Sequence, residues 1–241
     1  MKKLEKALKG LKYLCFLDFE GTQFSHEMIA FGASFASIDR KLNIKKAKEP
    51  ISFLVKSKNK VGKFVENLTG ISDYDLEKRG ISFDEALKQI KKYCGLYFKK
   101  TIFITFGNHD LKILGASCSY TFEYPADVAK AIQRNYLDYQ AFISEFIKDD
   151  HNNPYSLENY LKIFNIDFEG QAHDPKYDAL NLMYLYQAFL ENKEIVVSEY
   201  QKVLAKQSHL PLPIKDAISK LASGKDVTYS EFLSSVREYL K

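Results

Sequence analysis

Apolar runs of strand length mark the first part of the chain. Residues 13–19 (YLCFLDF) are mostly apolar and lie just before Gly21, which predicts a buried strand. The apolar runs 28–38 and 51–55 predict two more strands. The polar, lysine-rich segment 39–50 between them predicts a hairpin connection.

From residue 64 onward the apolar residues recur with helical spacing. Predicted helices cover 83–98, 109–117, 156–164 and 175–190, with a short buried strand at 101–106 and a strand edge that turns into a helix at 135–147. In the last helix, Asp174 is a suitable N-cap and Pro175 suits the first helical position. Strands that come first and then alternate with helices predict an α/β or α+β sheet covered by helices.

The composition changes in the last fifty residues. The segment LPLP (210–213) breaks the chain, and two short amphipathic helices follow it. Thr228 and Glu231 form the sequence pattern of a capping box before the second of these helices. We therefore interpret residues 1–191 as one domain and residues 192–241 as a helical extension. This extension would pack on the domain, on a partner protein or on a second copy.

The overall composition narrows the class of protein. With 46% hydrophobic and 27% charged residues, the chain resembles a globular protein with a real core. It has no apolar run of about 18 residues, and its basic start lacks the apolar core of a secretion signal. Cys15, Cys94 and Cys118 are far apart, which suits buried thiols in a reducing compartment. We expect a cytoplasmic protein without a membrane span, and the net charge of +4 permits a polyanionic partner without requiring one.

Asp18 and Glu20 are the first candidates for chemistry. Residues two apart in a strand share a face and lie roughly 6–7 Å apart along the chain, so both carboxylates project together while Phe19 points to the opposite layer. Carboxylates this close repel unless a cation lies between them, and Mg²⁺ prefers oxygen ligands. An isolated D-x-E is nevertheless common, and both acids can simply point into water at a strand end.

The same stretch also resembles a second kind of phosphate chemistry. In phosphatases of the haloacid dehalogenase type, an apolar run precedes D-x-D-G-T, in which the first Asp is the nucleophile and the second is the general acid. Here Glu20 stands in place of the second Asp, and its extra methylene would misplace the acid. The later lysine and paired acids of that family are not evident in the sequence.

Three more residues could complete a site for two metal ions. Asp110 follows the predicted strand 101–106, at the kind of strand end where active sites of open α/β sheets collect. His173 precedes the last helix of the domain and Asp178 lies about one turn into it, so both can converge on one point. Asp178 also borders an apolar stripe, where a carboxylate needs a partner. Taken alone, Asp110 is also a common first-turn acid and His173 a common capping residue.

Together these residues resemble the motifs of the DEDDh exonucleases, the DnaQ-like and RNase T-like group. Its pattern is D-x-E on the first strand, an Asp at a helix start in mid-chain and H-x-x-x-x-D near the end, matched here by Asp18, Glu20, Asp110, His173 and Asp178. The segments NLTGIS (67–72), YLDYQAFI (136–143) and SLENYLKIFNI (156–166) add to the resemblance, which covers about residues 10–191.

The resemblance implies an RNase H-like fold, with a mixed sheet flanked by helices. It also implies a 3′–5′ exonuclease that releases nucleoside monophosphates from single-stranded RNA or DNA ends. Asp18, Glu20 and Asp178 would hold two Mg²⁺ or Mn²⁺ ions, with Asp110 as a ligand directly or through water. His173 would act as general base on the attacking water.

The resemblance also implies where the nucleic acid would bind. Gly21 and Thr22 would border the terminal nucleotide, and Phe24 is a candidate for stacking on a base. A group of lysines either follows a nucleic-acid backbone or forms an ordinary solvated face: Lys41, Lys45, Lys46, Lys48, Lys56, Lys58, Lys60 and Lys63.

Two features depart from familiar versions of the family, namely His109 beside Asp110 and the polar segment 174–177 after His173. Neither change removes a motif residue. An alternative function is a regulatory binding module that keeps the exonuclease fold and acts through partner contacts. The sequence leaves RNA and DNA open, and we lean to RNA or short oligonucleotides because no polymerase-tethering region is evident.

Overall fold

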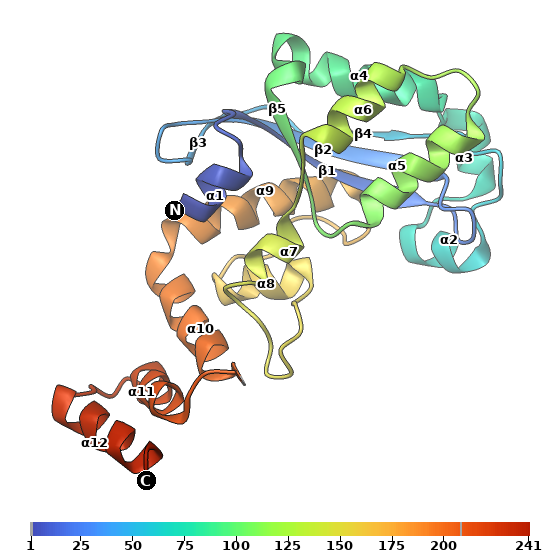
Figure 1. The fold of residues 1–241 in the computed structure, drawn as a ribbon. Coiled ribbons are helices and arrows are strands. Elements are labelled where there is room, and N and C mark those ends of the chain that lie inside the picture. The colour runs from blue at the N-terminus through green and yellow to red at the C-terminus, as the bar shows by residue number, and fades with distance from the viewer. Residues whose placement is uncertain (1, 208) are drawn as a thin grey trace.

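A six-stranded mixed sheet forms the centre of the protein, whose computed structural model describes residues 2–207 and 209–241 (Figure 1). The strands are β1 (Tyr13–Gly21), β2 (Met28–Ile38), β3 (Ile44–Ala47), β4 (Ile51–Leu54), β5 (Thr101–Thr105) and β6 (Tyr136–Asp138). The helices around the sheet are α1 (Lys2–Ala7), α2 (Lys63–Thr69), α3 (Asp73–Arg79), α4 (Phe83–Cys94), α5 (His109–Tyr120), α6 (Ala126–Arg134), α7 (Tyr139–Ile143), α8 (Leu157–Ile163) and α9 (Pro175–Glu191), with a 3₁₀ turn η1 (Gly95–Lys100) after α4. Helices α10 (Lys193–Ala205), α11 (Leu212–Ala222) and α12 (Tyr229–Tyr239) end the chain.

Strand β1 lies in the middle of the sheet, whose order is β3-β2-β1-β5-β6, with β4 also paired to β2. Strand β2 runs antiparallel to β1, whereas β5 runs parallel to β1 and β6 runs parallel to β5. The carboxyl ends of β1, β5 and β6 therefore meet at one edge of the sheet. This is the edge at which open α/β sheets bind ligands. The predicted mixed sheet flanked by helices is confirmed.

Alternation along β1 sends its side chains into two separate cores. Leu14 packs in the core that α9 covers, whereas Cys15 and Phe19 pack in the core on the side of α4, α5 and α6. Helix α9 is buried on almost all sides, as expected for a helix that is apolar nearly all round. Because Asp18 and Glu20 share the face of Leu14, they point to the side of the sheet that α9 covers.

A close contact between α9 and β2 sets how near the helix lies to the sheet. A Cβ atom at Gly32 would lie 1.7 Å from the carbonyl oxygen of Pro175, the first residue of α9. Gly32 is also the β2 residue that pairs with Asp18. The glycine therefore allows the beginning of α9 to lie against the strands at the level of Asp18.

Two predicted elements need correction. The segment 39–50 is more than a connection, because Ile44–Ala47 forms β3 and pairs with β2. The helix predicted over 83–98 ends at Cys94, because Gly95 adopts a φ of 60° and a 3₁₀ turn follows.

Five helices are absent from the sequence prediction, namely α1, α2, α3, α6 and α10. Helices α1 and α3 each bury a single side chain, Leu4 and Leu76, which is too little for a recognisable apolar stripe. Helix α6 does have an apolar face that includes Val128 and Ile132, so its pattern is present in the sequence.

Helices α10 to α12 extend away from the sheet (Figure 1). Val196 near the start of α10 is buried in the core that α9 covers, and the ring of Tyr200 lies 5.4 Å from that of Phe146. The predicted capping box is present, because Thr228 accepts a hydrogen bond from the Glu231 N–H and the Glu231 carboxylate accepts one from the Thr228 N–H. The C-terminal helices are thus joined to the main body through α10.

The cysteines and the apolar character of the helices were both considered from composition. Cys15 and Cys94 are buried and Cys118 is half-buried, and all three are free thiols in the described chain. Within residues 2–207 and 209–241, no helix has the combination of length and apolarity that a membrane crossing requires.

The contact at Gly32 predicts a specific sensitivity to mutation. Gly32→Ala should lower the free energy of unfolding by about 2–3 kcal/mol, because the added methyl group meets backbone rather than a flexible side chain. Gly115→Ala in α5 is the matched control, since its Cβ would meet no described atom within 4 Å and the change should be neutral or stabilising by up to about 1 kcal/mol. Urea unfolding followed by circular dichroism measures both, and equal midpoints would contradict the contact.

Candidate active site

Two carboxylates at the end of β1 form the floor of the candidate site. Asp18 and Glu20 lie opposite Gly32 and Ala30 of β2, and the beginning of α9 lies against the sheet at Gly32. The Oδ2 atom of Asp18 is buried and has no hydrogen-bond partner among the described residues. Buried polar atoms are normally paired, so this oxygen indicates a place for a cationic ligand.

Asp110 joins the start of α5 to the end of β1. Its side chain is buried, and its Oδ1 accepts a hydrogen bond of 2.8 Å from the backbone N–H of Phe19. Because β5 runs parallel to β1, the connection from β5 to α5 leaves the sheet at the same edge as Asp18 and Glu20. The topology therefore places Asp110 beside the two β1 carboxylates.

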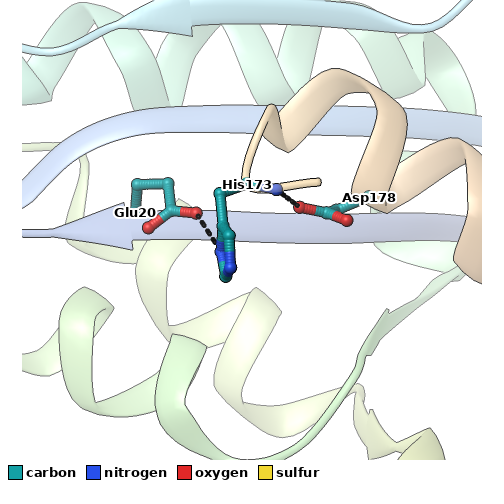
Figure 2. A group of neighbouring side chains, drawn as sticks. All are labelled: Glu20, His173 and Asp178. Carbon is teal, nitrogen blue, oxygen red and sulfur yellow. Dashed lines mark hydrogen bonds and ion pairs between the residues drawn. The ribbon is translucent and has the colours of Figure 1, made fainter. Parts of the chain in front are cut away.

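His173 lies in the loop before α9 and Asp178 lies on α9, and both approach the same point (Figure 2). One ligand atom from each of Glu20, His173 and Asp178 lies within 4.8 Å of the others. The Nδ1 atom of His173 is 3.8 Å from Oε1 of Glu20. The backbone N–H of His173 donates a hydrogen bond of 2.9 Å to Oδ2 of Asp178. A spacing of five residues across the helix start thus brings both residues to the β1 carboxylates, and Asp174 caps the helix between them.

Burial and mutual repulsion raise the pKa of every carboxyl group in the site. Burial raises the pKa of Glu20 to about 8, with Asp178 and Asp110 adding to the effect. Burial likewise raises the pKa of Asp110 to about 7 and that of Asp178 to about 6. The pKa of Asp18 is raised well above its ordinary value, first by burial and then by the neighbouring acids. The site therefore holds protons near neutral pH that a cation would displace.

This set of donors fits divalent metal ions. Four carboxylates supply the oxygen ligands that Mg²⁺ and Mn²⁺ prefer, and a bound cation would relieve both the repulsion and the unpartnered oxygen of Asp18. The residues available to hold it are Asp18, Glu20 and Asp178, with Asp110 alongside. His173, whose side chain is 47% exposed, lies at the open side of the group.

The predicted substrate residues lie in the turn that follows β1. A Cβ atom at Gly21 would lie 2.9 Å from Cγ1 of Ile113, so the glycine lets the turn pack against α5. Thr22 is buried, and its hydroxyl accepts a hydrogen bond of 3.0 Å from the Glu27 N–H. Phe24 is 83% exposed. Thr22 thus stabilises the turn. Contacts of Gly21, Thr22 and Phe24 with a nucleotide stay predictions.

An exposed apolar patch beside this turn was not predicted. The N–H of Gln23 donates to the carbonyl of Val61, and the side-chain oxygen of Gln23 accepts a hydrogen bond of 3.2 Å from the Phe64 N–H. Phe64 and Leu68 lie one turn apart on α2 and are 65% and 41% exposed. Helix α2 buries none of its side chains in the described structure. Only Val65 of this helix packs against a core cluster in the described structure, so Phe64 and Leu68 are large apolar residues that the core does not use.

Asn181 on α9 was also not predicted, and its side-chain amide is fully buried. It stands between Leu180 and Leu182 in a helix that is otherwise apolar along this stretch. Its polar side chain in that position was a readable signal. His109 is exposed, and its ring lies 5.2 Å from that of His26. Partial desolvation of the ring, followed by the charges of His26 and Lys112, lowers the pKa of His109.

The chain is similar to known exonucleases. The family model described as RNase_T: Exonuclease matches residues 15–186, a range that contains all five motif residues. The nuclease domain of 3′hExo, a DEDDh family member solved with rAMP, is 21% identical, with a TM-score of 0.60 over 76% of this chain and 93% of that chain. Cell-death related nuclease 4 is 22% identical, with a TM-score of 0.57 over 75% of this chain and 64% of that chain. Exonuclease I of E. coli, solved with an oligonucleotide, is 16% identical, with a TM-score of 0.58 over 81% of this chain and 44% of that chain.

At these identities the solved structures show a shared fold. No curated protein sequence matches the chain. The resemblance to the DEDDh exonucleases is confirmed by the family match and the shared fold together.

The raised pKa values predict that the metal-free protein loses stability as pH rises. The unfolded chain releases these protons near pH 4, whereas the folded site holds them up to between about pH 6 and pH 8. In this window the folded state binds more protons, so the free energy of unfolding falls as pH increases. The Tm without metal should therefore be lower at pH 8 than at about pH 5, and excess Mg²⁺ should raise it most at pH 8.

Asp18→Asn tests the origin of this effect. It should flatten the pH dependence and raise the Tm of the metal-free protein at pH 8, because burial and the neighbouring acids raise the pKa of Asp18 well above its ordinary value. Asp127→Asn is the control, because Asp127 is a surface acid whose pKa is lowered by its hydrogen bond with Lys91. Differential scanning calorimetry measures each Tm, and an unchanged slope in Asp18→Asn would contradict the assignment.

Proposed function

Because the chain belongs to the exonuclease family that the RNase T model describes, we propose that it shortens single-stranded RNA or DNA from the 3′ end and releases nucleoside monophosphates. One observation carries this proposal. Glu20 and Asp178 lie beside His173, Asp18 is close enough to Glu20, Asp110 and Asp178 for their charges to raise its pKa, and the Oδ2 atom of Asp18 is buried without a partner in the described chain. Such a group of acids is suited to hold cations against a phosphodiester.

Asp18, Glu20 and Asp178 are proposed to hold two Mg²⁺ or Mn²⁺ ions, with Asp110 contributing directly or through water. When bound, such ions supply Lewis acidity at the phosphate and positive charge beside the leaving oxygen. The protein contributes orientation. The hydrogen bond from Phe19 fixes one oxygen of Asp110, and the hydrogen bond from the His173 N–H fixes one oxygen of Asp178.

His173 is proposed as the general base. Its half-exposed imidazole lies next to Glu20 at the open side of the site, where it can take a proton from water. The hydroxide so formed attacks the last phosphorus, the bond to the 3′ oxygen of the preceding nucleotide breaks, and that oxygen takes a proton from solvent. The product is a nucleoside 5′-monophosphate and a strand that is one nucleotide shorter.

The surface beside β1 supports a path for a single strand. Phe24, Phe64 and Leu68 expose apolar surface around the turn that leaves the site, and bases stack on such side chains without sequence preference. Two solved neighbours hold nucleotide ligands in their own structures, rAMP in the nuclease domain of 3′hExo and an oligonucleotide in exonuclease I. RNA or short oligonucleotides remain the substrates that we favour.

The structure divides the predicted lysine group into two parts. Lys45 and Lys46 lie on β3, which pairs with residues 36–38 of β2, at the end of the sheet away from Glu20. Lys48 lies over two aromatic rings, 5.0 Å from the ring centre of Phe35 and 5.3 Å from that of Tyr93. The lysines that follow β4, namely Lys56, Lys58, Lys60 and Lys63, are exposed, and Lys58 among them donates a hydrogen bond to the carbonyl of Tyr120. We propose that Lys56, Lys60 and Lys63, rather than the whole group, approach the phosphate backbone.

Residues 192–241 are proposed as an extension to the exonuclease domain of residues 1–191. Its outer helices α11 and α12 expose apolar side chains, among them Leu212, Tyr229 and Leu240. This surface supports a protein partner or self-association as its role. The buried thiols Cys15 and Cys94 support a reducing, cytoplasmic location.

Two alternative functions predict different results. A regulatory binding module on the same fold would not turn over any phosphodiester, and the full set of five motif residues favours an enzyme instead. A haloacid dehalogenase-type phosphatase would use Asp18 as a nucleophile, whereas the family match favours the exonuclease.

Stepwise cleavage is the first functional prediction. The wild-type protein should shorten a 5′-labelled single-stranded RNA or DNA one nucleotide at a time with Mg²⁺ or Mn²⁺, and it should leave p-nitrophenyl phosphate intact. Asp18→Asn should abolish the ladder of shortened strands. His173→Ala should lower kcat by roughly 10²–10⁴-fold if it is the base. Gel analysis of time courses measures both. Hydrolysis of p-nitrophenyl phosphate with an untouched oligonucleotide would sink the proposal, and no turnover of either would favour the binding module.

Phe24 provides a prediction about substrate binding. Phe24→Ala should weaken binding of a single-stranded oligonucleotide by about 5- to 100-fold, the range expected when one base loses its stacking partner. Phe122→Ala is the matched control, because Phe122 is 95% exposed and follows the end of α5 opposite to Asp110. Fluorescence anisotropy with Ca²⁺ in place of Mg²⁺ measures the affinities. Equal affinities for the two variants would remove Phe24 from the binding surface.

A further inference from the structure

The loop that carries His173 is held by contacts at both of its ends. This His173 loop (residues 169–173) precedes α9, and His173 itself adopts a φ of 65°, in the left-handed region that side chains other than glycine seldom occupy. Its far end is fixed by the hydrogen bond from the His173 N–H to Asp178. Its near end is fixed by Asn181, a residue outside the set of metal and base residues described above.

The side-chain amide of Asn181 forms hydrogen bonds with both the N–H and the carbonyl of Glu169. Its Oδ1 accepts a hydrogen bond of 3.0 Å from the Glu169 N–H, and its Nδ2 donates one of 2.9 Å to the Glu169 carbonyl. The same nitrogen donates a hydrogen bond of 2.8 Å to the carbonyl of Tyr177. Both amide hydrogens are therefore used, which satisfies a side chain that is fully buried.

Two further contacts leave the near end of the loop little freedom. A Cβ atom at Gly170 would lie 2.2 Å from Cγ of Tyr177, so the loop backbone rests directly on that ring. The hydroxyl of Tyr184 donates a hydrogen bond of 2.8 Å to the carboxylate of Glu169. Only Gln171 and Ala172 then separate this end from His173.

Asparagine is otherwise poorly suited to the place of Asn181. Its helix propensity is low, and burying an amide is costly unless its hydrogen bonds are made. Leu180 and Leu182 on either side show that the helix accepts apolar residues at this level. The position thus uses a residue that weakens the helix in order to hold the loop.

We propose that Asn181 is a positioning residue, which clamps Glu169 so that the His173 loop holds the imidazole beside Glu20. This inference rests on the proposed role of His173 as the base. The side chain of Asn181 makes its hydrogen bonds to Glu169 and Tyr177, so it reaches the site through the His173 loop. Losing the clamp should therefore slow the chemical step without weakening substrate binding.

The test compares Asn181→Leu, which keeps the branching of the side chain and removes its hydrogen bonds, with Gln187→Ala on the same helix. Gln187 also accepts a backbone hydrogen bond, of 2.8 Å from the Ile44 N–H, but at the edge of the sheet away from the site. With Mg²⁺ and a labelled oligonucleotide, Asn181→Leu should lower kcat by roughly 10- to 100-fold and leave KM nearly unchanged, because a small misplacement of the base suffices for such a loss. Gln187→Ala should leave kcat unchanged.

A double-mutant cycle separates positioning from a general loss of structure. In a His173→Ala background, Asn181→Leu should lower kcat far less than in the wild type, because the imidazole that the clamp positions is gone. An unchanged kcat in Asn181→Leu, or the same loss with and without His173, would overturn the proposal.

Hydrogen exchange tests the clamp without any turnover. The amides of residues 169–173 should exchange faster in Asn181→Leu than in the wild type and in Gln187→Ala. Equal exchange rates would overturn the clamp even if the enzyme is active. If the wild type cleaves no oligonucleotide, the proposed function fails, and the exchange rates still decide whether Asn181 holds the loop.

Discussion

The burial of four carboxyl groups in one small space is the central physical problem of this fold. Four acids share one partly buried space, and the pKa of each is raised because its ionised form is costly there. Left to themselves, such side chains would separate into water. The fold keeps them together because they come from rigid elements that meet at one edge of the sheet, namely β1, α5 and α9.

Several contacts exist in order to hold this edge together. Gly32 lets α9 approach the strands at the level of Asp18, and the hydrogen bond from Phe19 to Asp110 ties α5 to β1. Asn181 holds the loop before α9. The acids that these contacts hold together are costly to ionise when buried, so the site lowers the stability of the metal-free chain as pH rises. A cation that binds to the folded state would return that stability by mass action.

The sequence contains most of the information about the central part of the fold. Alternation in β1 predicts that Asp18 and Glu20 share a face while Phe19 lies on the other, and the structure shows this division. The N-cap at Asp174 and the helix after it also follow from local rules. Strand β3 could not be predicted from the sequence, because Ile44–Ala47 is half polar and becomes a strand only by pairing with β2.

The candidate site was predictable as a set of acids but not as an arrangement. Spacing brings His173 near Asp178, yet the approach of both to Glu20 depends on how α9 crosses the sheet at Gly32. Phe64 and Asn181 were missed for a related reason. Whether an apolar side chain is exposed, or a polar one fully buried, is decided by tertiary packing, and a sequence pattern only indicates that the residue is out of place.

The most direct test of the central claim is a crystal structure with Mn²⁺ and a nucleoside 5′-monophosphate, in which anomalous scattering locates the metal. We predict two manganese ions among Asp18, Glu20 and Asp178. The phosphate of the nucleotide should contact the ions, and His173 should lie at the open side of the site. Manganese bound elsewhere, or no anomalous signal at these carboxylates under conditions in which the protein is folded, would contradict it.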